Sequence, residues 1–260
     1  MAFETILTAT EGAAFIITLN RPTRRNAMSI KMTKEIEEAC RIAEADAAVR
    51  GVIITGGPDY FSSGADLNEA LAIKSFLDAF THMKTWEALT DTIENLQKPV
   101  IAAVEGFCIT GAWELAMACD IRVAGEGASF MLTGSRIGTV PGGGGTQRLP
   151  REVGLGRALE IHFSAEPIDG KEAYRIGAVN RLVAKGQALD EAKKMVKGYE
   201  KRAPLSLAMA KRAVRAGMQM DMKSAIEYER FLVTAVYMTE DRKEGIQAFL
   251  DKREAAFKGR

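Results

Sequence analysis

Apolar residues in the first half of the chain fall into short runs bounded by polar or turn-forming residues. Four runs are rich in Val, Ile and Ala and have the length of buried strands: AAFIITL (13–19), GVIIT (51–55), PVIAAV (99–104) and DIRVA (120–124). The longer stretches between them repeat their apolar residues at helical spacing. Strands that alternate with helices predict an α/β fold with parallel strand pairing.

Polar residues between these runs mark where helices begin. Ser29 is a residue type that caps helices, and it precedes a helical pattern over 30–49. The apolar side of this helix is formed by Ile30, Ile36, Cys40 and Ala43. Further helices are predicted within 68–96 and over 111–118, and the latter leads into the strand at 120–124.

The pattern changes after residue 142. PGGGGTQRLP (141–150) is typical of a turn that leads into a helix, and no low-complexity linker follows it. One short strand, AVNRLV (178–183), interrupts an otherwise helical second part. Helices are predicted at 155–164, 169–177, 187–202, 204–217, 221–238 and 240–254. The change is therefore one of architecture and not a flexible joint.

Charge and cysteine content narrow the class of protein. The formal net charge is +1, which gives no support for binding nucleic acid or an anionic membrane. The most apolar window, 99–119, is interrupted by two glutamates and two glycines, so no membrane span is predicted. The three cysteines fit no metal pattern and no signal peptide precedes them, so we expect a reducing, cytoplasmic setting and no metal site.

Several common catalytic motifs are missing from the sequence. PGGGGTQRL (141–149) lacks the Gly-Lys-Ser/Thr of a phosphate-binding loop, and no G-x-G-x-x-G opens a strand–helix unit. The hydrolase motif G-x-S-x-G is also absent, and only His82 and His162 could act as the base of a serine hydrolase. We assign both histidines to packing or to the surface, which leaves no credible protease or nucleotide site.

Two glycine turns and one glutamate carry more chemistry. YFSSGADLNEA (60–70) follows the strand at 51–55, and FCITGAWELA (107–116) repeats the layout of strand, glycine turn and helix. Each stretch read alone is equally well a tight turn. Backbone N–H groups from two such turns can also converge on one carbonyl oxygen as an oxyanion hole. Glu114 stands in the second stretch among apolar residues, where an unpaired carboxylate is rarely buried.

Five segments in this order resemble the crotonase family, also called the enoyl-CoA hydratase/isomerase superfamily. They are LNRPTRRNAMS (19–29), FSSGADLNE (61–69), KPVIAAVEGFCITGAWELAMACDIRVA (98–124), IGTVPGGGGTQRLPREVG (137–154) and DRKEGIQAFLDKREAAFKG (241–259). The similarity covers nearly the whole chain. It implies an α/β spiral of repeated ββα units, placed at 1–200 with the CoA site, and a helical oligomerisation region at 201–260. It also implies a homotrimer, or a hexamer formed as a dimer of trimers.

The resemblance implies an acyl-CoA thioester as substrate, with coenzyme A as part of that substrate and no permanently bound cofactor. The thioester oxygen would lie between the N–H groups of Ala65 and Gly111, which would stabilise an enolate. Arg24 and Arg25 add charges that could meet the CoA phosphates. The family's CoA contacts map here to Thr23, Arg24, Arg25, Ser63, Ala65, Asp66 and Leu67, and from a neighbouring subunit to Phe249 and Lys252.

Hydratases of this family use two glutamates around one water, and this chain keeps only one of them. The first maps to Glu114. The second belongs to a segment that reads FMLTGSRIG here (130–138), with Gly134 in its place after Thr133. The glycine removes one acid/base and is expected to leave space. Trp113 is also unusual for the family, and we expect it either to pack in the core or to shape the acyl pocket.

The sequence therefore leaves several reactions open within one family. An enoyl-CoA hydratase-type lyase, with Glu114 activating the water, is the first of them. Loss of CO₂ from an activated acyl-CoA is the second, motivated by Thr133, and double-bond isomerisation by a single carboxylate is the third. The Gly134 replacement also motivates a catalytically impaired acyl-CoA-binding paralogue. Retention of Glu114 and of both glycine turns argues against that last reading.

Overall fold

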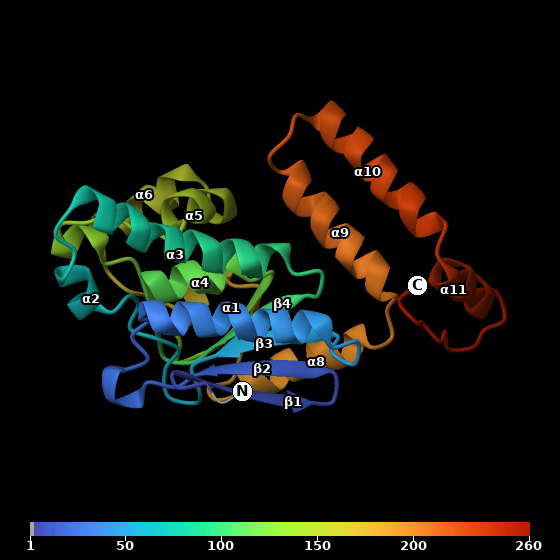
Figure 1. The fold of residues 1–260 in the computed structure, drawn as a ribbon, viewed down its shortest axis with the longest axis horizontal. Helices are drawn as coiled ribbons and strands as arrows, with labels where there is room; N and C mark the ends of the chain where they lie inside the picture. Colours follow the sequence, from blue (N-terminus) through green and yellow to red (C-terminus); the bar gives the residue numbers. More distant parts are fainter. Residues whose placement is uncertain (1–2) are drawn as a thin grey trace.

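The computed structural model describes residues 3–260, and a six-stranded sheet lies at its centre (Figure 1). The strand order is β1 (Ile6–Glu11), β2 (Ala14–Leu19), β3 (Gly51–Thr55), β4 (Val100–Val104), β6 (Ile121–Gly125) and β9 (Arg181–Val183). Only β1 pairs antiparallel, with β2, and the pairs from β2 to β9 are parallel. Each of the four predicted early strands is present, within one residue of its expected start. The edge strand β1 was not predicted, because only its first residue is buried and it shows no alternation.

A second, three-stranded sheet is formed by β5 (Phe107–Ile109), β7 (Ser129–Met131) and β8 (Ile168–Asp169). The strand pairs β4/β5 and β6/β7 each place one strand in the large sheet and the next in the small one. Helix α4 (Gly111–Ala118) follows the first pair, and η2 (Gly134–Ile137) and α5 (Gly145–Val153) follow the second. These are the repeated strand–strand–helix units that the resemblance implied.

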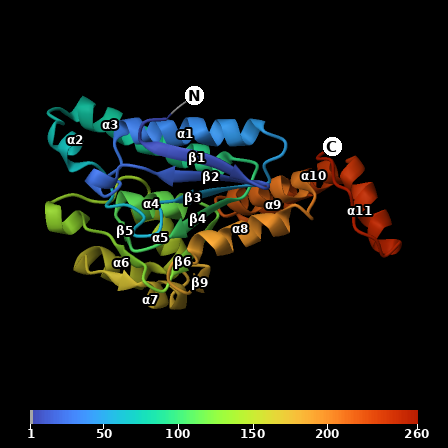
Figure 2. The ribbon, with the colours of Figure 1, turned by 90° about the horizontal axis from the view of Figure 1, so that it is seen from below.

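Helices cover both faces of the large sheet (Figure 2). On one face α1 (Ile30–Ala45), α3 (Phe76–Asn95) and α4 pack over strand residues such as Val52 and Ile54. On the other face α8 (Ala188–Tyr199) packs over alternate residues such as Ile53. Ser29 caps α1 as predicted, accepting from the Met32 N–H at 3.2 Å. The predicted stretch 68–96 contains α3 and all but the first residue of the short α2 (Leu67–Leu71).

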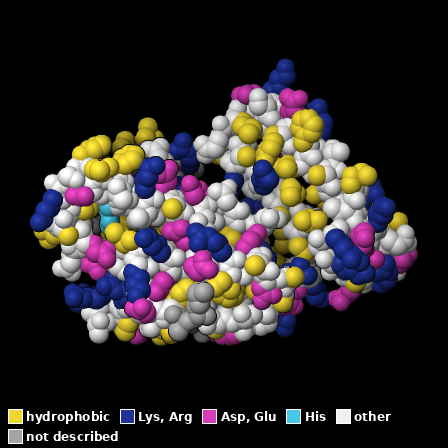
Figure 3. Space-filling model, viewed as in Figure 1, with side chains coloured by type: hydrophobic (Ala, Val, Ile, Leu, Met, Phe, Trp, Pro, Cys, Tyr) yellow, Lys and Arg dark blue, Asp and Glu magenta, His cyan; other side chains and the backbone are white. Residues whose placement is uncertain are grey.

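The chain after residue 154 is mainly helical, as the sequence pattern indicated. It contains α6 (Leu155–Ser164), α7 (Gly170–Arg175), α9 (Pro204–Gly217), α10 (Met222–Tyr237) and α11 (Glu240–Leu250). Helices α9 to α11 extend away from the sheet layers (Figures 1 and 2). They expose large apolar side chains, which gather in yellow over α9 and α10 in Figure 3 and include Val214, Met218, Met222, Phe231 and Tyr237. Within residues 3–260, no helix has the length and apolar character that crossing a bilayer requires.

Candidate active site

The two glycine turns lie against each other in the fold. Isolated bridges join Ser62 to Cys108 and Met28 to Ala65, so the 62–65 turn sits between two other segments. The buried Ser62 hydroxyl donates to the Asn26 carbonyl at 2.7 Å and accepts from the Gly64 N–H at 3.1 Å. Sequence reasoning missed Asn26, a buried side chain that bonds both ends of the loop between β3 and this turn. Its side-chain amide donates to the carbonyls of Gly56 and Phe61.

The N–H groups of Ala65 and Gly111 are brought together at this contact. A Cβ placed on Gly111 would lie 3.3 Å from the Ala65 nitrogen, and one placed on Gly64 would lie 3.4 Å from the Gly111 nitrogen. Gly64 has φ +93°, and its added Cβ would also lie 2.5 Å from the Ile109 carbonyl, so only glycine fits there. Within residues 3–260 neither N–H donates a hydrogen bond. Both donors are therefore free for one acceptor, and their role as an oxyanion hole stays a prediction.

Trp86 of α3 forms a wall that sequence reasoning did not find. Its ring lies over Gly111, where an added Cβ would come within 2.5 Å of the indole Cη2. The same ring lies 3.2 Å from the position of an added Cβ on Gly143. The tryptophan is buried, and its helical spacing marks it only as a core residue. Its contacts place an aromatic surface directly beside the two N–H donors.

Glu114 is buried, with 2% of its surface exposed, and a glycine turn surrounds its carboxylate. Its Oε1 accepts from the Gly145 N–H at 2.8 Å. An added Cβ would lie 3.0 Å from Oε1 at Gly145 and 3.3 Å from the glutamate Cδ at Gly143. Burial raises the pKa of Glu114, and the N–H groups of Gly145 and Gly143 and the charge of Arg148 offset this only in part. The glycine turn PGGGG (141–145) therefore binds the Glu114 carboxylate. The sequence showed only that this turn is not a phosphate-binding loop.

The expectation of free space at Gly134 is wrong. A Cβ added there would lie 2.8 Å from the Thr139 carbonyl oxygen and 3.1 Å from both Val140 and Pro141. The Thr139 N–H also donates to the Gly134 carbonyl at 3.0 Å. The 139–141 segment thus closes over the position, because a residue without a side chain lets the backbone approach.

A pair of threonine hydroxyls lies next to this closed position. The Thr110 and Thr133 hydroxyl oxygens are 2.8 Å apart, and the Thr133 N–H donates to the Thr110 hydroxyl at 2.9 Å. Thr110 directly precedes Gly111 and has φ 42° and ψ −103°, an uncommon conformation for a β-branched residue. The hydroxyl bonds and a 2.7 Å bond from its N–H to the Met131 carbonyl hold it there. The Thr133 hydroxyl is thus engaged with Thr110, a partner that the sequence did not single out.

Trp113 lies in the core. It is fully buried, and its ring centroid is 5.4 Å from that of Phe130 in a tilted contact. Of the two roles considered for this residue, packing fits its position. The adjacent residues of α4 thus have different roles, since Trp113 anchors the helix while Glu114 faces the glycine turn.

The two stretches proposed for CoA contact are neighbours. Thr23 and Arg24 lie in the short helix η1 (Pro22–Arg24), and Arg25 follows it with φ 51°. All three are exposed, and the Ser63 N–H donates to the Arg25 carbonyl at 3.0 Å. Leu67 of the second stretch is exposed as well.

Asp66 has a structural role in this region. Its side chain caps α2 by accepting from the Asn68 N–H, and it pairs with Arg21 at 2.9 Å. Burial raises the pKa of Asp66, but the hydrogen bonds from Arg21 and Asn68 outweigh that effect and leave it below its usual value.

Phe249 and Lys252 do not join the site of their own chain. They lie at or just after the end of α11, at the opposite end of the long axis from α2 (Figures 1 and 2). Phe249 is 84% exposed. A contact of these residues with CoA therefore requires the site of another subunit, as the resemblance implied.

Known proteins of one family are similar to this chain over nearly its full length. The model of the family described as Enoyl-CoA hydratase/isomerase matches residues 9–260. A probable enoyl-CoA hydratase of Rhizobium meliloti is 38% identical, covering 100% of both chains. A crotonyl-CoA hydratase of Syntrophomonas wolfei is 38% identical over 99% of both. The solved enoyl-CoA hydratase of Bacillus anthracis superposes with a TM-score of 0.93 at 33% identity, covering 99% of this chain and 100% of that one. The fold predicted from the sequence is thereby confirmed.

Proposed function

The chain belongs to the enoyl-CoA hydratase/isomerase family, and we propose that it adds water across the double bond of a 2-enoyl-CoA thioester with Glu114 as the base. The observation that carries the proposal is the placement of a buried carboxylate beside two free N–H donors. Gly111 begins α4 and Glu114 stands three residues later, so one turn of helix supplies both a donor and the base.

The chemistry follows from this arrangement. The thioester oxygen accepts from the N–H groups of Ala65 and Gly111, and Glu114 takes a proton from a water that attacks C3. A bond forms between the water oxygen and C3, and the double-bond electrons move through C2 onto the thioester oxygen, giving an enolate. The two donors stabilise that charge where it develops. A proton then adds to C2, and because position 134 carries no carboxylate, we assign that proton to a second water. The hydroxide left by this water takes back the proton held by Glu114, which restores the carboxylate.

Burial makes Glu114 a stronger base than an exposed glutamate, since its pKa lies above the usual value. A base works best when its pKa approaches the working pH. The N–H bond from Gly145 occupies one carboxylate oxygen and orients the side chain. In the proposed mechanism the other oxygen, Oε2, takes the proton from the water.

The CoA part of the substrate lies, in this proposal, along 23–25 and 63–67. Arg24 and Arg25 are exposed beside Ser63, where guanidinium groups suit the phosphates of CoA. CoA enters and leaves as part of the thioester, and the proposed steps use no other organic cofactor.

We further propose a homotrimer or a hexamer made of two trimers. The exposed apolar side chains of α9 to α11 would be covered by neighbouring copies, and Phe249 and Lys252 would reach a neighbour's CoA. Light scattering coupled to size-exclusion chromatography tests this, and a monomer at micromolar concentration would contradict it. We also propose a cytoplasmic location for the protein. The three cysteines are buried and form no disulfide, which fits a reducing compartment.

A panel of CoA thioesters tests the reaction itself. Crotonyl-CoA, longer and cyclic enoyl-CoAs and methylmalonyl-CoA are incubated with the protein, and the products are identified by mass spectrometry. Gain of one water by an enoyl-CoA is expected. Release of CO₂ from methylmalonyl-CoA, or a shifted double bond without added water, would replace hydration by decarboxylation or isomerisation. Tight binding without turnover of any thioester would identify a binding protein.

A further inference from the structure

Arg148 of α5 contacts the glycine turn that surrounds Glu114. Its Nη1 donates to the Gly143 carbonyl at 2.7 Å. Gly144 has φ +99°, and a Cβ there would lie 1.8 Å from the same Nη1, so the guanidinium fills the space that a side chain would need. The turn therefore contacts Glu114 through its N–H groups and Arg148 through a carbonyl.

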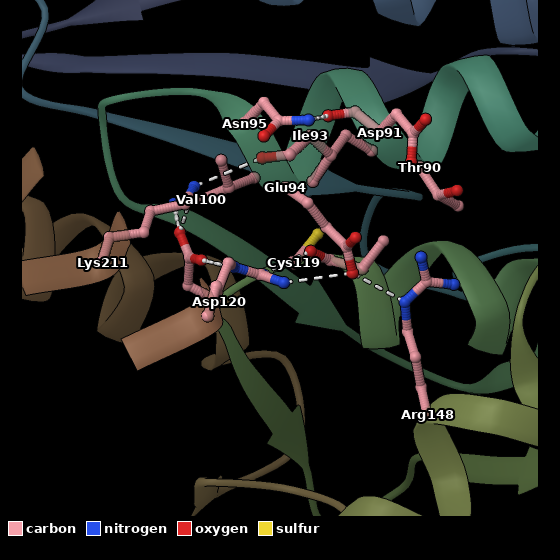
Figure 4. A network of polar contacts seen from close by, with 12 residues as sticks. Thr90, Asp91, Ile93, Glu94, Asn95, Val100, Cys119, Asp120, Arg148 and Lys211 are labelled. Carbon is pink, nitrogen blue, oxygen red and sulfur yellow. Dashed lines mark hydrogen bonds and ion pairs between the residues drawn. The ribbon is translucent and has the colours of Figure 1, made fainter. Parts of the chain in front are cut away.

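A network of ion pairs holds Arg148 from the other direction (Figure 4). Its Nε donates to Glu94 of α3 at 2.7 Å, and the same Glu94 oxygen pairs with Arg215 of α9 at 3.1 Å. Arg215 and Lys211 of α9 both pair with Asp120, at 2.9 and 2.8 Å. These side chains are mostly shielded from solvent, so screening weakens the pairs less than at an open surface. The network thus ties α9 to α3 and α5.

We propose that Arg148 is a positioning residue for Glu114, held by Glu94, and that together they fix the glycine turn in the geometry that orients the catalytic carboxylate. A guanidinium presents its N–H groups in a rigid planar fork, so one side chain can bind Glu94 and the Gly143 carbonyl at once. Lysine has a single flexible ammonium and cannot reproduce both contacts in that geometry. The proposal rests on the proposed function for its kinetic readout only.

Arg148 also acts on Glu114 through its charge, which favours the ionised carboxylate. Helices α3 and α5 and strand β6 pack against α4, and the charged groups they carry include Glu94 on α3, Arg148 and Glu152 on α5, and Arg122 on β6. Glu152 is paired with Arg122 at 2.9 Å. Arg148 is the cation that lowers the pKa of Glu114 against the effect of burial. Removing it is therefore expected to raise that pKa further.

The test compares Arg148→Lys, Arg148→Met and Glu94→Gln with the unchanged protein. In Arg148→Met the kcat for the enoyl-CoA hydrated best is expected to fall about 10- to 100-fold, with KM within about twofold, because the base is displaced while CoA contacts remain. Arg148→Lys keeps the charge and is expected to recover only part of kcat. Glu94→Gln keeps an acceptor, preserves the fold and should show a smaller loss in the same direction. Arg151→Met, three residues further along α5, is the matched control, since within residues 3–260 Arg151 donates hydrogen bonds to Gln147 alone.

A second readout needs no turnover. The carboxyl carbon of Glu114 is titrated by NMR in ligand-free protein labelled at glutamate, and its signal is assigned by its loss in Glu114→Gln. The midpoint is expected to move to higher pH in Arg148→Met and to stay in place in Arg151→Met. An unchanged midpoint in a folded Arg148→Met protein, or equal losses in kcat for Arg151→Met, would overturn the proposal. If no thioester is hydrated at all, the titration still decides this inference separately.

Discussion

The two sides of the candidate site differ in what surrounds them. On the Glu114 side, the 141–145 turn presents N–H groups to a buried carboxylate and is held by Arg148. On the Gly134 side, the backbone of 139–141 closes over the glycine, and the nearby hydroxyls of Thr110 and Thr133 bond each other. The glycine at position 134 is thus accompanied by closure of the backbone and not by a cavity. The polar groups available for catalysis are concentrated on one side.

Glu114→Gln, on the Glu114 side of the site, is expected to have the largest effect. Replacing the base is expected to lower kcat by about 10²- to 10⁴-fold, because an amide cannot accept the proton from water. Affinity for an unreactive saturated acyl-CoA, measured by calorimetry, should stay unchanged. Glu160→Gln on the exposed surface of α6 serves as control. Full turnover by Glu114→Gln would remove Glu114 from the mechanism.

Gly145→Ala tests the turn while leaving the Glu114 side chain itself unsubstituted. The added Cβ lies 3.0 Å from Glu114 Oε1 and from Pro141 Cβ, so the glutamate must shift by a few tenths of an ångström. We expect a loss of about tenfold in kcat, since small misplacements of a reacting group are costly. Gly156→Ala in α6 meets no atom within 4 Å and should leave kcat unchanged. Equal activity of both variants would show that the turn does not orient Glu114.

Gly134→Ala and Gly134→Glu test the closed side. The alanine Cβ would lie 2.8 Å from the Thr139 carbonyl, so we expect a decrease of about 1–3 kcal/mol in the free energy of unfolding, measured in urea. Gly134→Glu should gain no crotonyl-CoA hydration, because the backbone occupies the space in which a side chain would enter. A large gain in hydration would instead show that the 139–141 segment opens readily and that the missing acid limits the reaction.

Thr133→Val removes one hydroxyl from the threonine pair at nearly constant volume. The Thr133 N–H can still donate to Thr110, so the expected cost is about 1 kcal/mol of stability, measured by thermal unfolding. Turnover should remain within about threefold, as the hydroxyl lies outside the proposed acid–base machinery. Loss of turnover with binding retained would place a catalytic group on the Gly134 side and favour the decarboxylase reading.

The smallest effect concerns the stability of Glu114→Gln as a function of pH. Burial raises the pKa of Glu114 in the folded state above its ordinary 4.5, so ionisation of this group disfavours folding. The glutamine variant should therefore be more stable than the unchanged protein at neutral pH. As the pH falls through the folded pKa and then below 4.5, the carboxyl is protonated in both states and the difference should vanish. Melting curves at pH 7 and pH 4 measure it, and a constant difference would contradict the assignment.

Local patterns determined much of this molecule. Short apolar runs bounded by turn residues located the central strands, and the apolar pattern together with flanking turn residues located the bounds of α4, α6 and α9. The same reading brought the two glycine turns and Glu114 forward, since both turns follow strands and a glutamate interrupts an apolar helix. The resemblance then pointed to Ala65 and Gly111 as the residues whose N–H groups would donate. A family resemblance supplied the chemistry that links them.

Only the tertiary structure decided what surrounds these groups. The Gly145 N–H donates to Glu114, which is 31 residues away in the sequence. Arg148 donates to Glu94, which is 54 residues away. Trp86 over Gly111 is likewise a contact between elements whose sequences carry no mark of each other. The closure over Gly134 is local, but it depends on how the 139–141 segment turns back over the glycine. A local pattern reports which residues face inward, but a partner at long range is fixed by how the elements pack. For this protein the sequence by itself brought forward a candidate base and two candidate donors. The packing of α3, α5 and the 139–145 segment determined what holds the Glu114 carboxylate and why position 134 has no room for a side chain.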